Sequence, residues 1–109
     1  MLKLEIELDL NILKWMDYDC DRVAKFMTKV TKHVGLVEEI NENGYFLYQG
    51  PGLNTDLAHI ATICDALKNY DWFKASCKKL NLLDNAFSDD GSFYVEGDWI
   101  KTYKEFGAW

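Results

Sequence analysis

Nine residues near the N-terminus, from Leu2 to Leu10, alternate between apolar and charged side chains, and this alternation constrains the fold more than any other stretch. From Leu2 to Leu10, every even position is leucine or isoleucine and every odd position carries a charge. Successive side chains of a β-strand point to opposite faces. The pattern therefore predicts a strand with one buried aliphatic face and one charged face, on which Glu5, Glu7 and Asp9 form an outward acidic row.

Further helices and strands are expected along the rest of the chain. Helical periodicity or capping signals mark residues 19–34, 54–69, 71–80 and a segment that begins at Asp98; apolar runs bounded by turns mark strands at 36–40, 45–48 and 92–96. The Asn43-Gly44 dipeptide tolerates positive φ and predicts a hairpin between two of these strands. The order β-α-β-β-α-α-β-α predicts an α+β fold, with a mostly antiparallel sheet of about four strands and helices packed on one face.

The length and the aromatic content describe the expected core. With 109 residues, the chain is expected to form one domain over residues 1–109. Hydrophobic residues make up 49% of it and aromatic residues 15%. Each large aromatic side chain buries roughly 150–250 Å² when it is enclosed. A core of this size cannot enclose them all, so some aromatic side chains should lie partly exposed.

The formal net charge of −6 limits the classes of partner that the chain can bind. Nonspecific binding to nucleic acid relies on lysine and arginine to replace phosphate counterions, so direct nucleic-acid binding is not expected. Docking on an anionic membrane is disfavoured for the same reason, and no apolar stretch approaches the ~18 residues of a membrane span. A larger protein with a basic surface is a suitable partner.

Three cysteines, Cys20, Cys64 and Cys77, fall at apolar positions of expected helices and show no CxxC spacing. An odd number without such spacing is typical of free, buried and reduced thiols. No basic segment followed by an apolar run resembles a secretion signal. These observations predict a cytoplasmic protein, located in the host cell if the gene is carried by a phage.

No motif in the chain predicts catalysis, a metal site or a cofactor. His33 and His59 lie on different expected helices and lack the spacing of HExxH-type zinc sites. Cys64 lies within an apolar stripe, whereas a catalytic thiol needs a polar, electropositive setting. The Gly-Pro-Gly turn at residues 50–52 has no basic residue of a phosphate loop beside it. We therefore expect a binding protein that is not an enzyme and uses no cofactor.

The first expected helix carries a basic stripe, opposite in charge to the acidic row. Its members share one side of the helix, within about 80° around the axis at ~100° per residue. They are Arg22, Lys25, Lys29 and Lys32. The stripe is either a solvated face that partly neutralises the acidic row, or a contact for an acidic surface or for phosphates.

The surplus of aromatic residues and the acidic patches favour a protein that binds another macromolecule. Aromatic side chains supply much of the binding energy at interfaces, while charges steer and select the partner. We expect an inhibitor or antagonist that covers a basic functional surface of a larger protein, such as a nucleic-acid-binding enzyme. The expected partner-binding residues are Glu5, Glu7, Asp9, Glu38, Glu42, Tyr45, Tyr48 and Trp109. By size and charge alone, the chain is comparable to phage anti-defence proteins such as anti-CRISPRs.

Three alternative functions fit the same sequence. An immunity protein that neutralises a toxin would use a similar acidic surface. A small enzyme or ligand-binding domain would need a pocket with converging polar groups between the sheet and the helices. A structural subunit would form a homodimer through residues 45–48, a strand that is apolar on both faces.

Overall fold

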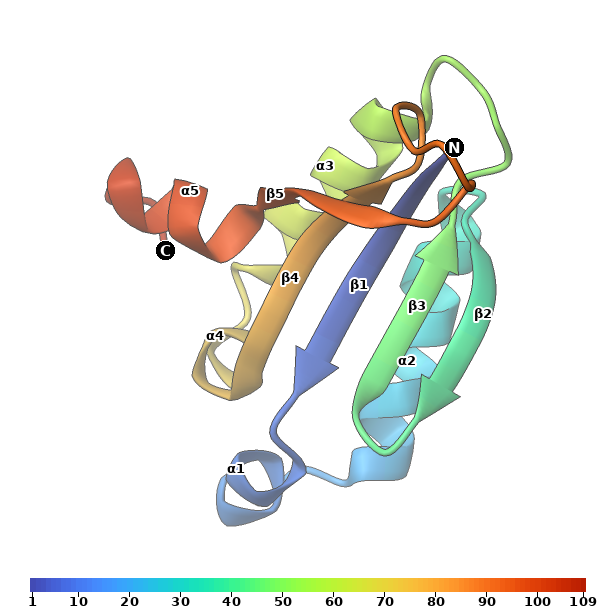
Figure 1. Cartoon of the computed structure of the whole chain (residues 1–109). Coiled ribbons are helices and arrows are strands. Elements are labelled where there is room, and N and C mark those ends of the chain that lie inside the picture. Colours follow the sequence, from blue (N-terminus) through green and yellow to red (C-terminus); the bar gives the residue numbers. More distant parts are fainter.

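The computed structural model describes all residues of the chain, Met1–Trp109, and folds them into a five-stranded antiparallel sheet with helices on one face (Figure 1). The strands are β1 (Leu2–Leu8), β2 (Val37–Glu42), β3 (Tyr45–Gln49), β4 (Cys77–Asp84) and β5 (Tyr94–Asp98). The helices are α1 (Leu10–Trp15), α2 (Cys20–His33), α3 (Asp56–Leu67), α4 (Asp71–Ser76) and α5 (Trp99–Glu105). The predicted α+β class is confirmed, with one strand more than expected.

The N-terminal strand is the centre of the sheet, whose strand order is β2-β3-β1-β4-β5. Leu4, Ile6 and Leu8 point into the core and are almost completely buried. The alternation holds up to Leu8, where the strand ends. Asp9 does not continue it, because its carboxylate accepts hydrogen bonds from the backbone N–H groups of the following turn and caps α1. The predicted strand is therefore two residues too long.

Helix α2 and the hairpin after it form where the sequence predicts them. The carboxylate of Asp19 caps the N-terminus of α2, and Val23 and Met27 pack against the sheet. Asn43 and Gly44 adopt φ values of 52° and 82°, as the tight turn between β2 and β3 requires. The hairpin joins β1 through β3, so the first strand and the hairpin share one sheet.

The region from residue 71 to residue 84 differs from the prediction of a helix over 71–80. Helix α4 ends at Ser76, and the chain continues directly into β4. The reason is tertiary, because β4 supplies the second neighbour of the central strand and places Leu80 opposite Ile6. The alternation of residues 79–82 is a strand signal that the helical pattern of the preceding residues masked.

Two smaller differences lie near the two ends of the chain. Helix α1, near the N-terminus, was not predicted, and strand β5 covers Tyr94–Asp98, two residues later than predicted. The last helix begins as expected, because the side chain of Asp98 accepts a hydrogen bond from the Lys101 backbone N–H at 3.1 Å.

Helices α2 and α3 cover one face of the sheet, and α1 and α4 lie at the end where β1 finishes (Figure 1). The opposite face carries no helix. The segment between β4 and β5 crosses this face near the start of β1, where the Lys3 ammonium lies 4.2 Å from the centre of the Phe93 ring. None of the five helices combines the length and the apolar character that crossing a membrane would require.

Candidate protein-binding surface

The helix-free side of the sheet, which we call the sheet face, presents mostly polar side chains from four strands. Its residues alternate with those that point into the core. They include Lys3, Glu5 and Glu7 from β1, Glu42 from β2, Tyr45, Leu47 and Gln49 from β3, and Lys79 and Asn81 from β4. Most of these side chains are half-exposed or exposed. The sheet face is therefore a solvent-accessible surface on a rigid backbone.

Glu5 organises the middle of the sheet face. One of its carboxylate oxygens accepts a hydrogen bond from the Tyr45 hydroxyl at 2.6 Å, and the other accepts one from the Asn81 side-chain amide at 2.9 Å. Partial burial, with the hydrogen bond to Glu5 and the charges of Glu5 and Glu7, raises the pKa of Tyr45 to about 12. Tyr45 therefore stays protonated at neutral pH and is held in one orientation.

Two further carboxylates flank Tyr45 across the sheet. The strand register places Glu7 of β1 and Glu42 of β2 directly opposite Tyr45 on its two sides. Side chains in such cross-strand pairs have Cβ atoms about 4.5–5.5 Å apart. No lysine or arginine nitrogen lies within 4.0 Å of either carboxylate. Glu5, Glu7, Glu42 and Tyr45 form one cluster, which we call the acidic patch.

Two of the predicted acidic contributors lie elsewhere. Asp9 is the N-cap of α1 and faces the backbone of that helix, where it accepts hydrogen bonds at 2.9 Å and 3.3 Å. Glu38 points to the helix side of the sheet, because its carboxylate accepts hydrogen bonds from the Thr28 hydroxyl at 2.7 Å and from the Asn41 amide at 2.9 Å. The acidic patch therefore contains neither residue.

Two of the predicted aromatic contributors also lie away from the acidic patch. Tyr48 is fully buried on the core side of β3, so it cannot contact a partner. Trp109 stacks on Tyr103 with 6.0 Å between ring centres and meets Phe73 edge-on at 6.4 Å. It fixes the C-terminus against α5 and the core. Because β3 also lies between β1 and β2, it has no free edge through which two copies could pair.

One acidic residue of the sheet face was not predicted. Glu39 pairs with Lys3 at 2.9 Å, because an irregularity in the register between Glu38 and Ile40 turns it toward β1. A bulge of this kind leaves no clear signal in a single sequence. The pair neutralises the charge of Glu39 on the part of the sheet face near the start of β1.

The basic stripe of α2 does not neutralise the acidic patch. Helix α2 packs on the opposite side of the sheet from Glu5 and Glu7 (Figure 1). The stripe consists of Arg22, Lys25, Lys29 and Lys32, all of them exposed. None of these cations has a carboxylate oxygen within 4.0 Å. The acidic patch and the basic stripe therefore lie on opposite sides of the sheet.

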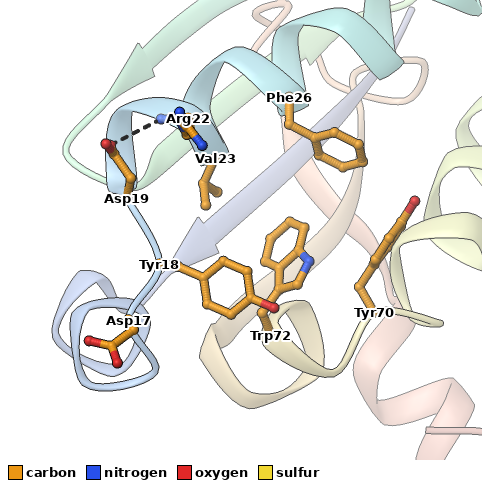
Figure 2. Close-up of a pocket in the computed structure, with 8 residues that line it drawn as sticks. All are labelled: Asp17, Tyr18, Asp19, Arg22, Val23, Phe26, Tyr70 and Trp72. Carbon is orange, nitrogen blue, oxygen red and sulfur yellow. Dashed lines mark hydrogen bonds between the residues drawn. The ribbon is translucent and has the colours of Figure 1, made fainter.

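An aromatic cavity of about 450 Å³ opens on the helix side, between α2 and α4. Tyr18 and Tyr70 flank Trp72, and Phe26 reaches the same rings from α2 (Figure 2). The centre of the Trp72 ring lies 6.0 Å, 5.6 Å and 5.8 Å from those of Tyr18, Tyr70 and Phe26. Trp72 is buried, while the two tyrosines remain exposed by 42% and 43%. The sequence analysis did not predict this cavity, because it joins residues from three separate segments.

Two of the three cysteines, Cys64 and Cys77, lack the features of a nucleophile. All three are free thiols. Cys64 is fully buried, and burial raises its pKa far above the ordinary value. Burial also raises the pKa of Cys77 to about 12. Both thiols are therefore protonated at neutral pH, and a protonated thiol is a poor nucleophile. No group of three histidine, cysteine, aspartate or glutamate residues is arranged to hold a metal ion.

Comparison with known proteins finds no relative of this chain. No protein-family model, no curated protein and no solved structure matches the chain. Inference about function therefore depends on the physical character of the two exposed surfaces, the acidic patch on the sheet face and the aromatic and basic side formed by the helices.

Proposed function

We propose that this chain is a small protein-binding module that acts as an inhibitor or antagonist. In this proposal the acidic patch covers a basic functional surface of a larger protein, such as the nucleic-acid groove of an enzyme. One observation carries the proposal: Glu7 and Glu42 flank Tyr45 on a helix-free sheet face, and no lysine or arginine nitrogen lies within 4.0 Å of either carboxylate. The chain would act in the cytoplasm of the cell that contains its partner.

The chemistry of the acidic patch suits this role. Unpaired surface carboxylates accelerate encounter with a basic surface and select against acidic ones, while an aromatic side chain supplies contact energy at the centre. The hydrogen bond to Glu5 already orients Tyr45, so less side-chain entropy is lost when a partner binds. The rigid sheet also fixes the spacing of the carboxylates before any contact is made.

Site-specific photo-cross-linking tests which side of the molecule binds. A photoreactive residue at Lys79 lies next to Glu7 in the sheet and leaves the acidic patch intact. The matched control carries it at Lys25, on α2 and on the opposite side, with the same loss of one positive charge. We expect the Lys79 variant to capture one discrete protein with a basic surface from the host lysate. Capture of the same protein with equal yield from both positions would contradict the proposal.

Association kinetics with the captured protein test the electrostatic mechanism. We expect Glu7→Lys and Glu42→Lys to slow association by about tenfold at low salt and to change dissociation much less. Glu105→Lys is the control, because it makes the same change in net charge on the exposed end of α5. If Glu7→Lys slows association less than about threefold, or no more than Glu105→Lys does, the acidic patch does not steer the partner.

A further inference from the structure

A second surface, on the side of the molecule opposite the acidic patch, has the form of a groove. A second cavity of about 590 Å³ lies beside the aromatic cavity, and Phe26 lines both. The second cavity lies between α2 and α3, with Val30 and Val34 on one wall and Ile63 and Ala66 on the other. We call the two together the α2–α3 groove.

The lining of the α2–α3 groove is apolar along most of its length. Val23 lies near one end and Val34 near the other. Eleven helical residues at 1.5 Å each separate them, so the groove is about 16 Å long, or three helical turns. Phe26, Val30 and Val34 are only half-buried, although they are large apolar residues. Half-exposed apolar side chains that line a cavity can receive the apolar side chains of a ligand.

The rim of the groove is positively charged. Arg22 lies beside the aromatic cavity, and Lys29, Lys32 and His33 line the second cavity. No aspartate or glutamate lines the second cavity, and no carboxylate oxygen lies within 4.0 Å of Arg22, Lys29 or Lys32. The two carboxylates of the groove, Asp17 and Asp19, lie at its aromatic end, near Arg22, and Asp19 caps α2 there. The ligand that complements this rim is therefore acidic.

We propose that the α2–α3 groove binds an amphipathic α-helical segment of another protein, with an apolar stripe and carboxylates along one flank. The lining offers few partners for a peptide backbone, because the Thr62 hydroxyl already donates to the Ala58 carbonyl oxygen at 2.8 Å. An extended segment would leave backbone groups unpaired on the apolar floor, whereas a helix satisfies its own. The carboxylates on its flank pair with Lys29 and Arg22.

The aromatic end of the groove provides the anchor position. The rings of Phe26, Tyr70 and Trp72 lie 5.5 Å to 5.8 Å from one another and form a concave wall. An aromatic or leucine side chain of the bound helix fills the cavity beside this wall, the geometry in which interface residues contribute most energy. The groove uses residues and a charge sign different from those of the acidic patch, so this inference is independent of the proposed function.

A synthetic peptide probe tests the proposal on the intact protein. The probe is a fluorescently labelled helical peptide of four turns, with leucine and one phenylalanine along one face and glutamates beside them. The control peptide has lysine in place of each glutamate. We expect the acidic peptide to bind at least about tenfold more tightly than the basic one in fluorescence anisotropy. Amide signals of α2 and α3, and not those of the sheet face, should shift in NMR spectra.

Substitutions in the groove locate the binding site. Ala66→Arg fills the apolar floor from an exposed position of α3, and Lys29→Glu reverses one rim charge; each should weaken binding about tenfold. Lys25→Glu is the matched control, because it makes the same charge change on α2 outside the groove, and it should change affinity less than about twofold.

Two results would overturn the proposal. The first is an affinity for the acidic peptide that is unchanged by Ala66→Arg, or is no greater than that for the basic peptide. The second is self-association of the wild-type chain in sedimentation that Ala66→Arg abolishes, because the groove would then be occupied by a second copy and not by another protein.

Discussion

Tyr45 and Tyr48 lie three residues apart on β3 and point to opposite sides of the sheet, so the same substitution should have opposite effects on stability. The Tyr45 hydroxyl donates to Glu5 at 2.6 Å on the solvent side. The Tyr48 hydroxyl is fully buried and forms no hydrogen bond of normal geometry. The Thr31 hydroxyl lies near it and donates to the Met27 carbonyl oxygen at 2.7 Å, but the two hydroxyls are not placed to form a hydrogen bond with each other. We predict that Tyr48→Phe stabilises the protein and Tyr45→Phe destabilises it.

The magnitudes follow from what each substitution removes. A buried, unpaired hydroxyl costs about 1–3 kcal/mol, and Tyr48→Phe removes that cost. The space left by one oxygen, about 15 Å³, costs about 0.4 kcal/mol. The net gain is about 1 kcal/mol. Tyr45→Phe removes a hydrogen bond to a charged acceptor, which at a half-exposed position contributes about 1 kcal/mol. The two variants should therefore differ by about 2 kcal/mol.

Urea unfolding, followed by tryptophan fluorescence at pH 7, measures both effects. For a slope of about 1.5 kcal/mol/M, the midpoint should rise by about 0.7 M for Tyr48→Phe and fall by a similar amount for Tyr45→Phe. The melting temperatures should shift by about 4 °C in the same directions. An equal loss in both variants would refute the reasoning, because it would mean that the Tyr48 hydroxyl forms a hydrogen bond in the core, with Thr31 as its partner.

Three further predictions concern the backbone and the ionisable groups. Gly44→Ala should destabilise the protein by more than about 2 kcal/mol, because the new Cβ would lie 2.6 Å from a carbonyl oxygen of β1. Gly91→Ala is the control: Gly91 has a similar positive φ but open space around it, so this variant should lose only about 1 kcal/mol. Chemical denaturation measures both losses. Asp56→Ala should cost about 2–4 kcal/mol, since the buried carboxylate accepts two backbone N–H groups at 2.8 Å and 3.1 Å; a change of less than 0.5 kcal/mol would contradict this. Folding raises the pKa of Cys77 from 9.0, and that of Tyr45 from 10.0, in both cases to about 12. The contribution of these groups to the free energy of unfolding is therefore complete below pH 9 and decreases as the pH rises to 12. Urea midpoints at pH 8, 9.5 and 11 should fall in that order, whereas a constant midpoint would show that these groups titrate alike in both states.

The parts of the fold that the sequence predicted are those determined by neighbouring residues. The alternation up to Leu8, the hairpin turn at Asn43-Gly44 and the caps at Asp19 and Asp98 each depend on a few adjacent side chains. Strand β4 depends on a distant partner, because the central strand β1 requires a second neighbour. A local helical pattern at residues 71–80 could not reveal that requirement.

The sequence predicted those site residues whose side of the sheet follows from an even or odd position in a regular strand. Glu5 and Glu7 follow directly from the alternation of β1. Glu38 was assigned to the sheet face, but the bulge before Ile40 changes the parity of β2 and turns Glu38 toward α2. Tyr48 belongs to a strand that is apolar on both faces, so only the position of the helices determines which face becomes the core.

The separation of charge across the two layers has a physical consequence for binding. Unlike charges on one side of a small protein would pair with each other, and each pair would weaken the attraction of either charge for a partner. Here the sheet lies between the acidic patch and the basic stripe of α2, and neither Glu7 nor Lys29 has an oppositely charged partner within 4.0 Å. At physiological salt, charges separated by more than about 8 Å are largely screened, so the two surfaces act independently. If both proposals hold, occupation of the sheet face would leave the α2–α3 groove open, and one molecule would hold a basic surface on one side and an acidic helix on the other.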